Sequence, residues 1–177
     1  MEPSVTIIPE IKINDRDVNS TRIRKLLAEG EVEEAATLLG RPFSVRSLVL
    51  EGEKRGRTLG FPTANLAPEN EILPAAGVYA GEMCLISGEG ADTYRNRDDD
   101  KRSYPSVINV GHRPTFHENG RLLAEAHLLD FEGDLYGATV ELSFCHRLRS
   151  EQKFPGPQEL KVQIAADIEL ARKKLRL

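Results

Sequence analysis

The sequence has few cysteines, no excess of positive charge and no long hydrophobic run, and each shortage excludes a class of protein. Two cysteines, Cys84 and Cys145, are too few for a disulfide framework or, alone, for a zinc site. A formal net charge of −4 argues against a protein that binds a nucleic-acid duplex. The apolar runs are far shorter than a membrane span, and the first residues lack the basic head and apolar stretch of a secretory signal. We expect a cytoplasmic protein that binds neither nucleic acid nor membrane.

The composition is that of a folded domain. The chain has 177 residues, of which 40% are hydrophobic and 29% charged, and this suits one ordinary domain with an appendage. The period of the apolar residues changes from helical to strand-like near Gly40. We therefore divide the chain into residues 1–40 and residues 41–177.

The first segment is expected to hold two short helices after an extended stretch at 5–13. Asn19 and the two hydroxyl residues after it offer caps for a helix that ends at Gly30, and a second helix, from about Val32 to Leu39, ends at Gly40. A hairpin of this size has one apolar side and is too small to bury that side alone. The apolar side must therefore lie against another part of the protein.

The second segment is expected to be mainly β. Short apolar or alternating runs follow one another without a helix between them, at 43–51, 78–86, 104–110, 122–131 and 138–145. This order predicts an antiparallel barrel or sandwich, and the turn at 132–134 predicts that the last two strands pair with each other. A closing helix is expected from about Gln158 to Leu175. The charged stretch 87–102 is read as a solvated loop, with a functional lid as the less favoured alternative.

A glycine-rich stretch, Gly52 to Thr58, resembles a phosphate-binding Walker loop that has lost a residue. We reject the Walker reading because that loop must open a helix, whereas Gly60 and Pro62 interrupt any helix here. Glycines and three cations between strands could still hold phosphate oxygens. An ordinary hairpin with solvated basic side chains is the favoured alternative from the spacing alone.

Two further positions carry chemistry that the residues alone leave open. Thr63 and Asn65 point to the same side of an extended segment and could present two neutral oxygens to Mg²⁺. From these residues alone, hydrogen bonds to the local backbone are the favoured alternative. Glu125 lies in the middle of a strand between two alanines. It could be a partly desolvated general base or a glutamate paired with an arginine. His127 shares its face and is expected to be structural.

Six linked motifs carry a resemblance to a known family. They are RPF (41–43), GRTLGFPTAN (56–65), GVYAG (77–81), NVGHRPTF (109–116), EAHLLDFEGDLYG (125–137) and LRSEQKF (148–154). Their order and spacing resemble the riboflavin kinase module of bacterial bifunctional FAD synthetases. The resemblance implies a six-stranded antiparallel Greek-key β-barrel with a C-terminal helix. It also implies an ATP-dependent transferase that phosphorylates riboflavin to FMN.

The resemblance implies roles for individual residues. Thr63 and Asn65 match the positions that hold Mg²⁺ with the ATP phosphates, and Glu125 matches the base that takes the proton of the ribityl 5′-hydroxyl. The nucleotide-binding positions are Lys54, Arg55, Gly56, Phe61, Thr63, Asn65, Leu128, Asp130 and Tyr136. The flavin-binding positions are Arg149, Gln152 and Phe154.

Residues 18–40 resemble the last motif and tail of the FMN adenylyltransferase module that precedes the kinase in such enzymes, although the family usually has Ser where Asn19 stands. The nucleotide-binding bulk of that module, with its His-x-Gly-His motif, is absent from this sequence. We therefore expect the hairpin's partner to be the missing domain, and the chain to make FMN but not FAD. The alternatives are an FMN adenylyltransferase and a non-catalytic flavin-binding module.

Overall fold

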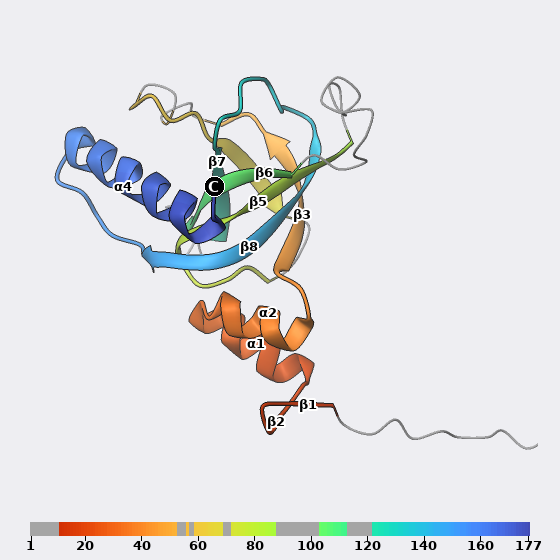
Figure 1. Ribbon diagram of the computed structural model, residues 1–177. Coiled ribbons are helices and arrows are strands. Elements are labelled where there is room, and N and C mark those ends of the chain that lie inside the picture. Colours follow the sequence, from red (N-terminus) through yellow and green to blue (C-terminus); the bar gives the residue numbers. More distant parts are fainter. Residues whose placement is uncertain (1–10, 53–55, 57–58, 69–71, 88–102, 113–121) are drawn as a thin grey trace, which may run out of the picture.

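A computed structural model describes residues 11–52, 56, 59–68, 72–87, 103–112 and 122–177. Six antiparallel strands form a closed barrel in the order β3-β4-β7-β6-β5-β8, with two helices below it and one helix on its side (Figure 1). The barrel strands are β3 (Phe43–Leu50), β4 (Ala64–Pro68), β5 (Gly77–Ser87), β6 (Ser103–His112), β7 (Leu122–Leu128) and β8 (Thr139–Ser150). The other elements are β1 (Lys12–Ile13), β2 (Arg16–Asp17), α1 (Ser20–Glu29), α2 (Val32–Leu39) and α4 (Pro157–Leu175). The six-stranded barrel and its closing helix are thus confirmed.

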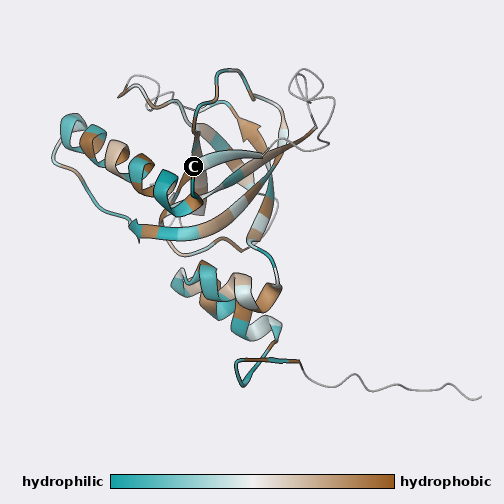
Figure 2. Ribbon diagram, in the orientation of Figure 1, coloured by the Kyte–Doolittle hydropathy of each residue, from teal (hydrophilic) through white to brown (hydrophobic). Residues whose placement is uncertain are grey.

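The helical hairpin begins and ends where the sequence predicts. The Asn19 side chain accepts a hydrogen bond from the backbone N–H of Arg22 at 2.9 Å, which caps the start of α1. Gly30 and Gly40 end the two helices with φ of 80° and 73°, a left-handed conformation that glycine adopts without strain. Figure 2 shows hydrophobic and hydrophilic residues mixed along both helices, as in helices with one buried side.

The apolar side of this hairpin is covered by the barrel itself. Leu27 and Val32 belong to the same buried cluster as Tyr79 and Phe144 of the barrel, and α2 packs on β3 and β8. Polar contacts fix the junction, since the Arg147 guanidinium donates to the Glu29 carbonyl at 3.0 Å. The expectation that the hairpin's apolar side needs the missing domain is therefore wrong. A hairpin joined to the barrel by one short connection can bury that side on its own neighbour.

The predicted pairing of the last two strands is also wrong. β7 pairs with β4 and β6, whereas β8 pairs with β3 and β5, so the two strands lie on opposite sides of the barrel. The connection through Glu132–Asp134 crosses the barrel end instead of making a tight hairpin. Backbone hydrogen bonds hold both ends of it, from Leu129 to Pro105 at 2.8 Å and from Gly137 to Val49 at 3.0 Å.

The closing helix α4 lies against the outside of β5, β6 and β8 (Figure 1). Ala171 and Ile168 of α4 pack on Val78 and Val107 of the barrel. A buried ion pair adds a polar contact, because Asp167 is 3% exposed and accepts from Arg149 at 2.9 and 2.8 Å. No helix in the described ranges is long and apolar enough to span a membrane.

The shared core makes a prediction about cooperativity. We expect Leu27→Ala to lower the free energy of unfolding by about 2–5 kcal/mol, because the truncated side chain leaves a cavity in the common core. Barrel and hairpin should still unfold in one denaturant transition. Leu170→Ala on α4 is the matched control, because its side chain is 38% exposed and should change stability little. A hairpin that melts separately, with the barrel unaffected by Leu27→Ala, would contradict a shared core.

Candidate active site at one end of the barrel

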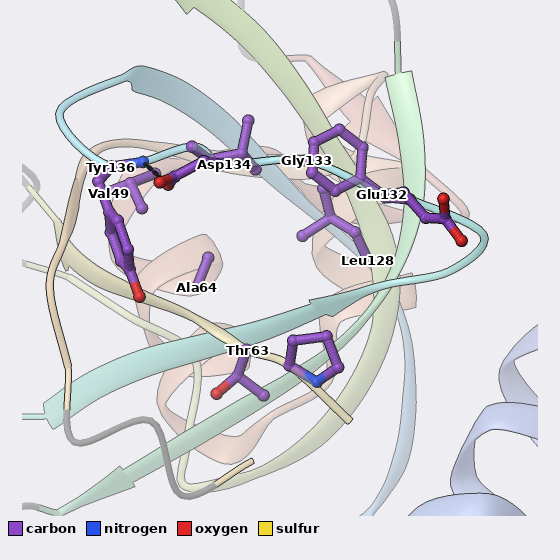
Figure 3. Close-up of a pocket in the computed structure, with 11 residues that line it drawn as sticks. Val49, Thr63, Ala64, Leu128, Glu132, Gly133, Asp134 and Tyr136 are labelled. Atoms are coloured by element: carbon purple, nitrogen blue, oxygen red, sulfur yellow. Dashed lines mark hydrogen bonds between the residues drawn. The ribbon is translucent and has the colours of Figure 1, made fainter. Parts of the chain in front are cut away.

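A pocket of about 500 Å³ opens at the end of the barrel where β3 and β7 end and β4 begins. Figure 3 shows Tyr136 and Leu128 facing each other across the pocket, with Thr63 below them. The lining residues are Val49, Pro62, Thr63, Ala64, Leu128, Phe131, Glu132, Gly133, Asp134, Leu135 and Tyr136. The connection that crosses the barrel end thus supplies one wall, and the segment before β4 supplies another.

The segment before β4 is fixed by His127. The Nδ1 atom of His127 lies 2.8 Å from the Pro62 carbonyl oxygen, and because a carbonyl only accepts, Nδ1 carries the proton. The same ring meets Phe61 edge to face, with centroids 5.7 Å apart. The predicted structural role of His127 agrees with these contacts. His127 holds the Phe61-Pro62-Thr63 segment against β7.

Two glycines make room for the predicted metal ligands. A Cβ at Gly52 would overlap the Asn65 amide, and a Cβ at Gly56 would lie 3.1 Å from the Thr63 hydroxyl oxygen. Both polar side chains therefore lie against the backbone of the glycine-rich loop. The described residues contain no cluster of three or more histidine, cysteine or acidic side chains. Two neutral oxygens suit Mg²⁺ that keeps phosphate and water ligands, so the residues present fit this ion.

Glu125 lies on the outer surface of β7, because Ala124 and Ala126 turn into the buried interior. It stands directly opposite Asn65 on β4 and Asn109 on β6. The side chain is exposed, so of the two alternatives for this residue the partly desolvated carboxylate does not describe it. The antiparallel register nevertheless brings Glu125 next to Asn65, a contact between adjacent strands that sequence spacing does not predict.

The predicted nucleotide residues divide between the pocket and its edge. Leu128 and Tyr136 line the pocket. Asp130 does not line it; its carboxylate accepts a hydrogen bond from Arg172 of α4 at 2.6 Å, which lowers the pKa of Asp130. Sequence reasoning missed Asp134, whose carboxylate accepts from the backbone N–H of Tyr136 at 2.9 Å and shapes the turn beneath that ring.

The predicted flavin residues lie where β8 leaves the barrel. The Arg149 guanidinium lies 5.7 Å from the centre of the Phe154 ring while it is paired with Asp167. Gln152, which lies between Arg149 and Phe154 in the sequence, is exposed. Asp167 was missed because a carboxylate on the buried side of a helix gives no sequence signal without its partner. Lys54 and Arg55 lie outside the described residues.

Comparison with known proteins assigns this architecture to a family. Residues 39–175 match the Flavokinase family of riboflavin kinases. The chain is 42% identical over 155 residues to a bifunctional riboflavin kinase/FMN adenylyltransferase of Haemophilus influenzae, covering 88% of this chain and 46% of that protein. It is 38% identical over 165 residues to the Bacillus subtilis protein of the same description, covering 92% and 48%. The chain thus spans about half the length of these relatives.

Two solved structures are similar to this one. A riboflavin kinase from Trypanosoma brucei superposes with a TM-score of 0.51 at 26% identity, covering 76% of this chain and 78% of that one. A Streptococcus pneumoniae protein described as a macrolide-efflux protein superposes with a TM-score of 0.79 at 33% identity, covering 93% and 50%. The family match runs from just before β3 to the end of α4, so it includes the whole barrel, the pocket and Glu125. The chain therefore belongs to the riboflavin kinase family.

Proposed function

We propose that this chain transfers the γ-phosphoryl group of ATP to the ribityl 5′-hydroxyl of riboflavin and releases FMN and ADP. The observation that carries the proposal is the position of Glu125 directly opposite Asn65, two residues from the pocket-lining Thr63, within a barrel of this family. A carboxylate and two neutral oxygen ligands side by side suit transfer of a phosphoryl group to an alcohol.

In this proposal the pocket at the barrel end takes the adenine nucleotide. Leu128 offers an apolar wall and Tyr136 an aromatic ring, which suits a planar base. The loop with Lys54, Arg55 and Gly56, and Phe61 after it, carries the phosphates. Asp130, paired with Arg172, lies at the edge of this site and links it to α4.

Thr63 and Asn65 would hold Mg²⁺ through their side-chain oxygens. When bound, the ion supplies neutralisation of charge on the phosphate oxygens. The role of the chain is to place both oxygens on one side of the strand, against Gly52 and Gly56. The glycine backbone can then approach the phosphates closely, as in other loops that bind anions.

Glu125 would accept the proton of the 5′-hydroxyl as that oxygen attacks the γ-phosphorus. The bond between the γ-phosphorus and the oxygen bridging to the β-phosphate breaks, and ADP leaves with that oxygen. Exposure on the barrel surface makes Glu125 reachable by an acceptor. Phe154 and Arg149, with Gln152 between them, would contact the isoalloxazine, whose planar ring suits an aromatic and a guanidinium surface.

One incubation separates this proposal from its alternatives. The purified chain is mixed with riboflavin, ATP and Mg²⁺, and riboflavin, FMN and FAD are separated. FMN is the expected product. Conversion of added FMN to FAD would favour the adenylyltransferase alternative, and binding of flavin without any product would favour a flavin-binding module.

The metal ligands give the next prediction. Thr63→Ala and Asn65→Ala should each lower turnover at ordinary Mg²⁺ concentrations by at least about 10–100-fold. Loss of a residue that only hydrogen-bonds to a metal ligand already lowers activity by that factor, and loss of a ligand itself should lower it at least as much. Riboflavin alone should still bind. Thr139→Ala, on β8 and away from the pocket lining, is the matched control and should keep its turnover. Near-normal rates in both variants would remove these residues from the metal site.

The general base gives a second prediction. Glu125→Gln should lower turnover by roughly 10²–10⁴-fold without changing the melting temperature, because the amide keeps the shape but takes up no proton. Glu125→Asp should lose less, since it keeps a carboxylate one methylene further back. Glu141→Gln is the matched control; Glu141 lies on β8 and accepts from Ser44 at 2.7 Å. If Glu125→Gln proves less stable but fully active, Glu125 is a structural ion-pair partner instead.

A further inference from the structure

One row of paired residues crosses five barrel strands and joins the two ends of the proposed site. Arg149 on β8 pairs with Val78 on β5, Val78 pairs with Asn109 on β6, Asn109 pairs with Glu125 on β7, and Glu125 pairs with Asn65 on β4. Directly paired residues in antiparallel strands point to the same face. The row therefore runs over the outer surface from a proposed flavin residue to a proposed metal ligand.

The helix α4 covers part of this row and leaves the rest open. Val78 is 4% exposed and packs with Ala171 of α4, and Arg149 is paired with Asp167 of the same helix. Asn109 and Glu125 are exposed. Neighbouring strands lie about 4.8 Å apart, so the backbone of Asn109 is one strand spacing from that of Glu125. The backbone of Arg149 is three spacings, or about 14 Å, from that of Glu125. Asn109 is the first open position between the flavin end and the base.

Two polar side chains, those of Asn109 and Glu151, lie close to the backbone of Gly111. Gly111 follows Asn109 on the same face of β6, and a Cβ there would lie 2.8 Å from a carboxylate oxygen of Glu151 and 3.6 Å from the Asn109 amide nitrogen. The absent side chain keeps the Glu151 carboxylate and the Asn109 amide next to each other. Carboxylates accept hydrogen bonds, whereas an amide both donates and accepts. Such a set suits a chain of hydroxyl groups, each of which also donates and accepts.

We propose that Asn109 and Glu151 bind the secondary hydroxyls of the ribityl chain, a subsite that rests on the proposed function. The isoalloxazine then lies toward Arg149 and Phe154 at the edge of α4. The ribityl chain passes over β6 at Asn109 and Gly111, and its 5′-hydroxyl meets Glu125. Asn109 thereby selects flavins that carry a polyol, because the ring alone does not reach this position.

The test compares riboflavin with lumiflavin, which has the same ring without the hydroxylated chain. Binding of each flavin is followed by fluorescence titration, and KM and kcat are measured for riboflavin. Asn109→Ala should weaken riboflavin binding about 3–10-fold, the value of one hydrogen bond, and should leave lumiflavin binding and the KM for ATP unchanged. Ser103→Ala is the control on the same face of β6, six residues away, where Ser103 bonds Glu82 at 2.8 Å. It should alter none of these values.

Gly111→Ala provides a second variant that retains Asn109. Gly111 does not have a left-handed φ, and the nearest atom to the added methyl belongs to the flexible Glu151 side chain, so the strand should fold normally. Riboflavin should again bind less tightly while lumiflavin does not. Equal weakening of both flavins, or unchanged riboflavin binding in both variants, would overturn the subsite. A wild-type chain that forms no FMN would instead refute the proposed function, which the lumiflavin comparison does not measure.

Discussion

The antiparallel register of the closed barrel decides which side chains can form a site. In a strand, neighbouring side chains alternate between the two faces, so a slip of one residue would move Glu125 into the core and Ala124 or Ala126 to the surface. Closure between β3 and β8 removes the free edges where such a slip could start. The positions of Glu125, of Asn65 and Asn109 beside it, and of the pocket wall thus all depend on pairings made with other strands.

Local signals predict most of the elements, but no run of apolar residues in the sequence marks β4. Asn19, Gly30 and Gly40 mark the helix ends because caps depend on a few neighbouring residues. The alternation from Ala138 to Phe144 shows which face of β8 is buried because strand periodicity is local too. The motif resemblance supplied the barrel as a whole, which no single run of residues could. Roles of individual site residues stay proposals, since no feature of the fold alone shows what a side chain binds.

Long-range partners were beyond such signals. The turn at Glu132–Asp134 has the composition of a hairpin, yet the strands around it separate because β4 and β6 compete successfully for both edges of β7. The motif resemblance singles out Arg149 as a proposed flavin residue, but the sequence does not reveal its buried partner Asp167, because the pair exists only once α4 lies on β8. The sequence also does not reveal that the apolar side of the helical hairpin packs on the barrel, because this contact too joins residues far apart in the chain.

Barrel closure also has a kinetic consequence. Phe43 of β3 pairs with Phe144 of β8, so the first barrel strand finds this partner only after a long stretch of intervening chain has formed. Contacts between residues so far apart in sequence are slow to form, because the entropy of closing the large loop is lost before any pairing is gained. During synthesis β3 therefore emerges with one edge unpaired, and the hairpin before it has only part of its eventual core. Emergence of β8, rather than of the N-terminal half, therefore sets the earliest time at which the barrel can close.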